Sequence, residues 1–287
     1  MTDPASDPEP EPDPLLERLR ATAKYRTLCD DVLRWALGDA RRRTRSDKEA
    51  LKVAKRKLHQ AFGSFVDASQ RKAVLRHLGD AADAAHGSDP VRYTAALEAA
   101  LVLHTSTAER ILHLSALWGA VLAAVDSAPG VSRASLRVLD LGCGVAPAAL
   151  PWSGLPAGVH YLGVDLDEAL CAALQAAVRP AFPHTRVRAA EVRNQAFEPT
   201  DVALLWKLLP TLERQEAGSA HALVARLDAR VLVATFPTRT LTGRDRGMED
   251  QYRALADAVL GPATPGGDLR IGDELVRIVV REPRPQS

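Results

Sequence analysis

The chain has 287 residues, enough for one large domain or two smaller ones with a sizeable buried core. Hydrophobic residues make up 46% of it and charged residues 25%, the ordinary balance of a soluble globular protein. No apolar run approaches the roughly 18 residues that a membrane span requires. The amino-terminal stretch is acidic and proline-rich, so we expect no secretory signal and no membrane partner. The three cysteines lie far apart in sequence, which excludes a CxxC metal or redox pair and favours a reducing, cytoplasmic setting.

Charge is distributed unevenly, although the net charge is only +1. Residues 1–14 hold five acidic side chains and no Lys or Arg, whereas residues 15–80 hold 17 Lys and Arg against 8 Asp and Glu. A basic block on a near-neutral chain points to a polyanionic partner. A solvated helical surface would carry the same pattern, so the charge alone leaves both interpretations open.

The first 103 residues are predicted to contain a tail and a helical domain. Residues 1–14 alternate acid and proline, cannot bury apolar area, and are predicted to be disordered. Residues 15–103 are predicted to form a small basic all-α domain, because apolar residues recur there at three- and four-residue intervals without a strand pattern. The candidates for contacting a polyanion lie in and beside a predicted helix over residues 47–61: Arg41, Arg42, Arg43, Lys48, Lys52, Lys55 and Arg56.

Residues 104–287 show a different pattern, in which strands and helices alternate. A helix through residues 111–121 is followed by predicted strands at 137–141, 159–164, 187–190, 202–205 and 231–234 and by predicted helices at 168–178 and 212–227. Such alternation is typical of parallel strands joined by helical crossovers. The last segments, 268–271 and 274–280, are predicted to form a hairpin at the edge of the sheet.

The first predicted strand ends in Gly142-Cys143-Gly144, and the second ends at Asp165. Glycines there let the backbone approach a ligand closely, and a carboxylate at the neighbouring strand end can accept two hydrogen bonds from a ribose diol. Pro147 stands where a dinucleotide-binding motif has its third glycine, and no P-loop lysine is present. These residues therefore favour S-adenosylmethionine over a phosphate-bearing cofactor, with an ordinary glycine turn as the alternative.

Several ordered segments carry a family resemblance: HTSTAER at residues 104–110, LLWKLLP at 204–210, LERQEAGSA at 212–220, FPTRTL at 236–241 and the Gly243-Arg244 and Gly247-Met248-Glu249 that follow. Together they resemble the aminoglycoside-resistance 16S rRNA methyltransferases, a family that modifies N7 of guanine 1405 in the decoding site. The resemblance covers residues 15 to about 280. It implies a Rossmann-like S-adenosylmethionine-dependent methyltransferase domain at 104–287, with 15–103 as a domain that docks on 16S rRNA in the assembled 30S subunit.

The same resemblance implies the site residues. With Gly144 of the glycine turn, the implied cofactor contacts are Phe65, His104, Thr105, Ser106, Arg110, Gly142, Asp165, Glu191, Val192, Trp206 and Gln215. The implied contacts to the target base and RNA are Lys207, Arg239, Arg244 and Met248, in addition to the seven basic residues near the predicted helix. Glu191 departs from the family, which usually has Asp there. Taken singly, Trp206 and Met248 could equally be core residues and Lys207 an exposed strand end.

The implied chemistry needs no catalytic acid or base. Guanine N7 has a lone pair and no proton to lose, so the protein must only align the lone pair, the methyl carbon and the sulfur. The histidines show no metal-ligand spacing, so we predict no metal. We expect a cytoplasmic monomer. The alternatives are a methyltransferase acting on another RNA position and a non-catalytic RNA-binding protein; the intact glycines and Asp165 argue against the latter.

Overall fold

The computed structural model describes residues 13–62, 68–238, 248–262 and 267–282. Its helices are α1 (Pro14–Arg20), α2 (Asp30–Arg43), α3 (Asp47–Phe62), α4 (Ala68–His86), α5 (Pro90–Leu103), α6 (Thr105–Ala108), α7 (Leu114–Ser127), α8 (Glu168–Val178), α9 (Leu208–Gln215), α10 (Ser219–Arg226) and α11 (Met248–Leu260). Short 3-10 helices are η1 (Ile111–His113), η2 (Arg133–Ser135), η3 (Ala146–Trp152) and η4 (Val192–Asn194). Within the described ranges, no helix has both the length and the apolar character that crossing a membrane requires.

Seven strands form one sheet: β1 (Arg137–Leu141), β2 (His160–Asp165), β3 (Thr185–Ala189), β4 (Thr200–Trp206), β5 (Ala229–Pro237), β6 (Leu269–Ile271) and β7 (Glu274–Val280). Their order is β3-β2-β1-β4-β5-β7-β6, with β1 to β5 parallel and the β6–β7 hairpin antiparallel. The predicted α/β class and the hairpin at the sheet edge are confirmed. The chain runs from β1 to β2 on one side of the sheet and from β4 to β5 on the other, so the strand order reverses between β1 and β4. Ligands bind at the carboxyl ends of the strands at such a switch point.

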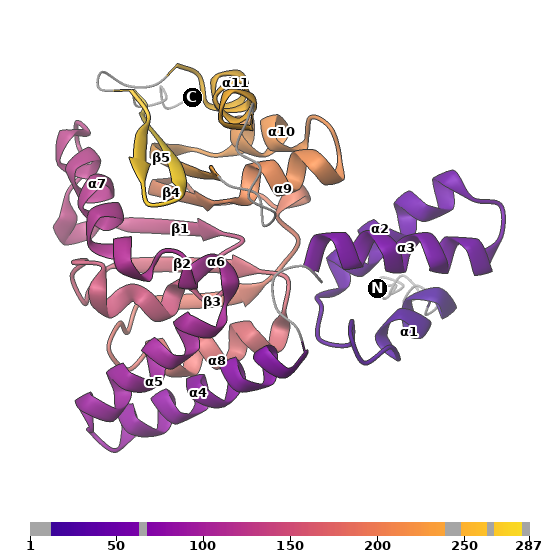
Figure 1. The fold of residues 1–287 in the computed structure, drawn as a ribbon, viewed down its shortest axis with the longest axis horizontal. Helices are drawn as coiled ribbons and strands as arrows, with labels where there is room; N and C mark the ends of the chain where they lie inside the picture. The colour runs from indigo at the N-terminus through magenta and orange to yellow at the C-terminus, as the bar shows by residue number, and fades with distance from the viewer. Residues whose placement is uncertain (1–12, 63–67, 239–247, 263–266, 283–287) are drawn as a thin grey trace, which may run out of the picture.

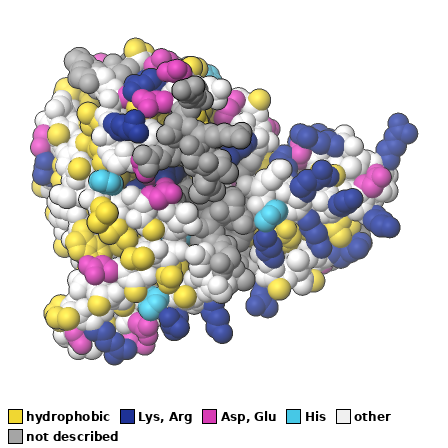
Figure 2. Space-filling view, viewed as in Figure 1, with side chains coloured by type: hydrophobic (Ala, Val, Ile, Leu, Met, Phe, Trp, Pro, Cys, Tyr) yellow, Lys and Arg dark blue, Asp and Glu magenta, His cyan; other side chains and the backbone are white. Residues whose placement is uncertain are grey.

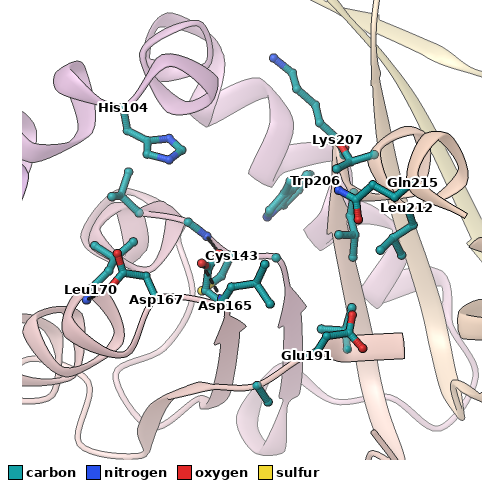
Figure 3. Close-up of a pocket in the computed structure, with 18 of the residues that line it drawn as sticks. His104, Cys143, Asp165, Asp167, Leu170, Glu191, Trp206, Lys207, Leu212 and Gln215 are labelled. Carbon is teal, nitrogen blue, oxygen red and sulfur yellow. Dashed lines mark hydrogen bonds between the residues drawn. The ribbon is translucent and has the colours of Figure 1, made fainter. Parts of the chain in front are cut away.

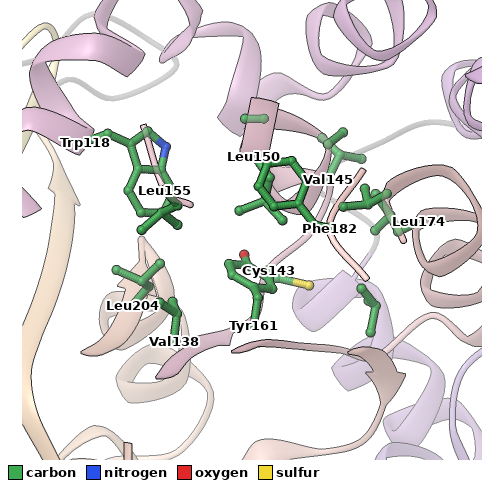
Figure 4. Packing of buried hydrophobic residues seen from close by; sticks show 14 of the residues in the cluster. Trp118, Val138, Cys143, Val145, Leu150, Leu155, Tyr161, Leu174, Phe182 and Leu204 are labelled. Atoms are coloured by element: carbon green, nitrogen blue, oxygen red, sulfur yellow. The ribbon is translucent and has the colours of Figure 1, made fainter. Parts of the chain in front are cut away.

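Alternate residues of the strands face two hydrophobic layers, as the pleat of a strand requires. Val138 and Leu204 face the layer that also contains Trp118 of α7 and Leu174 of α8 (Figure 4). Leu139 faces the opposite layer, which α9, α10 and α11 complete. Because both faces of the sheet are covered, its strands are almost continuously apolar.

Helices α4 and α5 pack on the elements that cover the sheet, α4 on α8 and α5 on η3, and share a hydrophobic core with the sheet and not with the helices that precede them. Their buried side chains, among them Leu78 and Leu97, belong to the same hydrophobic core as Leu174 of α8 and Val138 of β1. Figure 1 shows α4 running alongside α8, with α5 packed against α4. The core therefore groups residues 68–103 with the sheet, which differs from the predicted boundary at residue 103. Helical periodicity identifies an apolar face but not the element that covers it.

Helices α1, α2 and α3 form a separate bundle with its own core, to which Leu19, Leu33 and Leu58 contribute; it stands to one side of the sheet in Figure 1. The predicted tail of residues 1–14 is two residues too long. Asp13 caps α1 by accepting a hydrogen bond from the Leu15 N–H at 3.0 Å, and α1 begins at Pro14, whose fixed φ suits a first helical position. Residues 1–12 lie outside the described residues.

The helix predicted over residues 212–227 is two helices in the structure, α9 and α10. Glu216 is extended, with φ −158°, and Gly218 has φ +83° just before α10 begins. Glycine adopts this left-handed conformation without the steric cost of a side chain, so the chain turns there. α9 also starts earlier than predicted, directly after β4, and this places Gln215 at its carboxyl end.

Candidate functional site

A pocket opens at the carboxyl ends of β1, β2 and β4 (Figure 3). Most of the predicted cofactor contacts line it: His104, Arg110, Gly142, Gly144, Asp165, Glu191, Val192, Trp206 and Gln215. Thr105 is exposed and is not part of the lining. Phe65 and the side chain of Ser106 lie outside the described residues. Segments that are more than one hundred residues apart thus meet at one edge of the sheet.

The glycine turn after β1 forms the floor of this pocket. Gly142 and Gly144 have φ values of +64° and +50°, which disfavour any other residue. A Cβ at Gly142 would lie 2.9 Å from Leu208 Cδ1, and one at Gly144 would lie 3.1 Å from His104 Cε1. The turn therefore requires glycine for its backbone conformation and for the space that a ligand would fill.

Asp165 lies beside this turn, at the end of β2. Its Oδ2 accepts a hydrogen bond from the Gly144 N–H at 2.8 Å, and its Oδ1 accepts one from the Leu166 N–H at 2.7 Å. Burial raises the pKa of Asp165, and these two backbone donors oppose the rise. The donors fix both oxygens in the pocket, and each oxygen retains a lone pair. The carboxylate can therefore accept further hydrogen bonds from a ribose diol, as the sequence analysis predicts.

Part of the pocket is lined by Glu191, Val192 and Gln215. Glu191 Oε1 accepts a hydrogen bond from Arg193 Nη1 at 2.5 Å, and the guanidinium also donates to Gln215 Oε1. Burial raises the pKa of Glu191, while the neighbouring Arg193 lowers it. Sequence reasoning missed Arg193, although it follows two predicted cofactor residues directly in the chain.

A second group of charged side chains surrounds Trp206. Arg110 Nε donates to Glu274 Oε1 at 2.7 Å, and its Nη2 donates to Thr235 Oγ1 at 3.2 Å. Its guanidinium carbon lies 5.3 Å from the centroid of Trp206, which meets Trp118 edge-on with 6.2 Å between ring centroids. Trp206 therefore lines the pocket and also belongs to the hydrophobic core. Glu274 comes from the edge hairpin, and sequence reasoning missed it.

Lys207 has an unusual backbone and a nearly buried side chain. Its φ is +52°, a left-handed value that costs free energy for any residue but glycine, and such strain concentrates at functional sites. Its N–H donates to Thr235 Oγ1 at 3.1 Å. Its ammonium group pairs with Glu274 at 3.0 Å and with Glu109. Lys207 is thus held at the pocket and is not an exposed strand end.

The charges of this region set two further protonation states. Burial alone would raise the pKa of Glu274, but Arg110 and Lys207 hold it below the usual value. Burial, together with the same two cations, lowers the pKa of His104 to about 4, so its imidazole is neutral at pH 7. His104 can therefore contact a cationic sulfonium without charge repulsion.

The basic residues of the bundle lie on its surface, where Figure 2 shows Lys and Arg gathered. All seven predicted docking residues are exposed except Lys55, which is half-buried. Arg42 and Arg43 pair with the buried Asp39 at 3.3 and 3.2 Å, and Arg41 pairs with Asp13 at 2.7 Å. By contrast, the other four make no ion pair with any described residue: Lys48, Lys52, Lys55 and Arg56.

Two of the predicted target contacts, Arg239 and Arg244, lie outside the described residues. Met248 is the half-buried first residue of α11. Among the described residues, no group of three or more His, Cys, Asp or Glu side chains is arranged to hold a metal ion.

Known proteins resemble this chain over nearly its whole length. The family model described as ribosomal RNA methyltransferase (FmrO) matches residues 21–261. A 16S rRNA (guanine(1405)-N(7))-methyltransferase of Micromonospora echinospora is 32% identical over 96% of this chain and 98% of its own. One from Frankia casuarinae is 33% identical over 97% of this chain and 96% of its own.

Solved structures agree with this match. The 16S rRNA methyltransferase RmtF, in complex with S-adenosyl-L-homocysteine, has 34% identity and a TM-score of 0.76, covering 94% of this chain and 99% of its own. The 16S rRNA methylase RmtB has 30% identity and a TM-score of 0.71, covering 93% and 97%. The predicted fold class, enzyme class and cofactor are thereby confirmed. The chain belongs to the family of S-adenosylmethionine-dependent ribosomal RNA methyltransferases.

Proposed function

We propose that this enzyme transfers a methyl group from S-adenosylmethionine to N7 of guanine 1405 in 16S rRNA of the assembled 30S subunit, and so confers aminoglycoside resistance. The observation that carries the proposal is the junction at the end of β4. There Trp206 lines the cofactor pocket, and the next residue, Lys207, also lines it and has a strained backbone conformation. Relatives whose names specify this reaction match more than nine-tenths of the chain.

The chain's own residues need only bind and orient the two reactants. S-adenosylmethionine supplies an electrophilic methyl group, and guanine N7 is nucleophilic without losing a proton. In the proposed arrangement, Asp165 and the glycine turn hold the nucleoside, while Trp206 and Arg110 border the end from which the base enters. Holding two reactants in line lowers the barrier without a general base. Lys207, Arg239, Arg244 and Met248 are the residues we assign to the target nucleotide.

The bundle would supply most of the affinity for the subunit. Lys48, Lys52 and Arg56 are exposed and make no ion pair with any described residue, so phosphates can replace water around them without breaking an existing pair. Residues 15–80, which include this bundle, carry the chain's excess of basic side chains. We propose that it docks on folded rRNA away from the target base, that the enzyme acts as a cytoplasmic monomer, and that no metal takes part.

Primer extension after borohydride and aniline treatment tests the proposal, because this chemistry cleaves RNA at N7-methylguanine. Purified enzyme and S-adenosylmethionine are incubated with 30S subunits or with protein-free 16S rRNA, and the Asp165→Ala variant is the inactive control. We expect one new stop, at guanine 1405, in subunits and little in free RNA. A stop elsewhere would assign another target, and equal modification of both substrates would refute the docking role of the bundle.

A further inference from the structure

The helical bundle contacts the methyltransferase unit at the loop that carries Asp165. The Cys29 N–H donates to the Leu166 carbonyl at 2.9 Å, and the Glu168 N–H donates to the Thr27 carbonyl at 2.7 Å. Leu166 also packs against the core of the bundle. The bundle therefore forms part of the support of the pocket, in addition to offering an RNA-binding surface.

A second contact places Trp35 of α2 against the other pocket loop. The guanidinium carbon of Arg193 and the ammonium nitrogen of Lys57 each lie 4.0 Å from the centroid of the Trp35 ring. The indole N–H donates to Glu216 Oε2 at 3.1 Å, directly after α9. Trp35 itself is not part of the pocket lining, whereas Arg193 is.

Arg193 joins two walls of the pocket that belong to different elements. Its Nη1 donates to Glu191 after β3, and its Nη2 donates to Gln215 at the end of α9. Its side chain is 7% exposed, and its Nε has no hydrogen-bond partner among the described residues. A buried guanidinium depends on its neighbours for orientation, and an aromatic face at 4.0 Å restricts the plane in which it lies.

We propose that Arg193 is a positioning residue for the cofactor and that Trp35, a residue of the bundle outside the pocket, holds it in place. Without the indole, the guanidinium can leave the plane in which it bonds both Glu191 and Gln215. The pocket wall must then be ordered when the cofactor binds, at a cost to affinity. The inference rests on the cofactor assignment alone and is independent of the target nucleotide.

Calorimetric titration of the full-length protein with S-adenosylhomocysteine tests this role. We expect Trp35→Leu to bind three- to thirtyfold more weakly, in line with the range of cation–π contacts at partly to fully desolvated sites. Trp35→Phe keeps an aromatic face and should restore most of the affinity. Tyr25→Phe is the matched control, because it removes only a hydroxyl group, whose 3.0 Å hydrogen bond to the Lys55 carbonyl lies inside the bundle. Its affinity should equal that of the wild type.

A double variant shows whether Trp35 acts through Arg193. In an Arg193→Gln background, Trp35→Leu should weaken binding little further, because the interaction is already lost. Wild-type affinity in Trp35→Leu, fully additive losses, or an equal loss in Tyr25→Phe would each overturn the proposal. If Trp35→Leu does not fold, Arg193→Lys can replace it, because lysine keeps the charge but cannot donate to Glu191 and Gln215 from two nitrogens of one planar group. Undiminished binding in Arg193→Lys would also overturn the proposal. These titrations contain no RNA, so a wrong target assignment would leave them unchanged.

Discussion

Replacing Asp165 separates cofactor binding from folding. In the structure its two oxygens accept backbone hydrogen bonds at 2.8 and 2.7 Å and face the pocket, where we assign the ribose diol to them. Asp165→Asn removes the charge and turns one acceptor into a donor, and Asp165→Ala removes the group. A hydrogen bond to a charged group contributes about 1.5–3 kcal/mol. We therefore expect roughly tenfold weaker cofactor binding for Asn and roughly hundredfold or more for Ala, at about 1.4 kcal/mol per decade.

Folding should respond differently, because burial raises the pKa of Asp165. A carboxyl group whose pKa is raised by folding binds protons more tightly in the native state, so its ionised form lowers stability above the unfolded-state pKa. Asp165→Asn removes that charge, which favours the folded state at pH 7, but it also removes one of the two backbone hydrogen bonds, which costs about 0.5–1.5 kcal/mol. These two effects on the free energy of unfolding oppose each other, so the net change should be small. A loss of binding free energy that exceeds the loss of folding free energy is the signature of a ligand contact.

Calorimetric titration with S-adenosylhomocysteine and urea unfolding measure the two quantities. Asp201→Asn is the matched control, since Asp201 also accepts a backbone hydrogen bond, from the Arg137 N–H at 2.8 Å, but lies at the amino ends of the strands. Its cofactor affinity should be unchanged. Wild-type affinity in Asp165→Ala, or the same loss in Asp201→Asn, would show that the carboxylate at 165 does not contact the cofactor.

Three further predictions follow from particular residues. Gly142→Ala should lower stability and cofactor affinity, because φ is +64° and the new Cβ would lie 2.9 Å from a leucine methyl group. Gly130→Ala, at φ +77° with no atom within 4 Å, should incur only the backbone cost of about 1–2 kcal/mol and leave affinity unchanged; equal affinities in the two variants would refute the first expectation. Burial raises the pKa of Asp140 to about 7, so its contribution to stability falls as pH rises from about 4 to 7. Urea unfolding measured across that pH range should show that the free energy of unfolding depends less on pH in Asp140→Asn than in the wild type. An unchanged pH dependence would contradict the raised pKa of Asp140. Lys52→Gln should weaken 30S binding and reduce the log–log salt slope by about one unit, whereas Arg179→Gln, an exposed residue at the far end of α8, should not; equal effects would make the bundle an ordinary solvated surface.

Local pattern was sufficient for much of this protein. Alternating strands and helices gave the class of the second domain, and the helix predicted at residues 168–178 has the bounds of α8. The glycine turn and Asp165 were predicted to contribute to the same nucleoside-binding site, and in the structure a hydrogen bond of 2.8 Å joins them. These features are set by periodicity, by backbone conformations that only glycine adopts readily, and by the rule that parallel strands present their carboxyl ends together.

The tertiary structure decided which partners the charged and helical segments have. Arg110 and Glu274 are 164 residues apart in sequence yet 2.7 Å apart in space, and no local pattern pairs them. The apolar faces of α4 and α5 fit a helical domain as well as they fit the core of the sheet, and only packing placed them in that core. Sequence analysis assigned no role to Arg193; the folded chain brings Trp35 of the helical bundle against it. Sequence determines which side chains can pair, but the geometry of the folded chain selects the pairs, because a buried charge is stable only where a partner from another element reaches it.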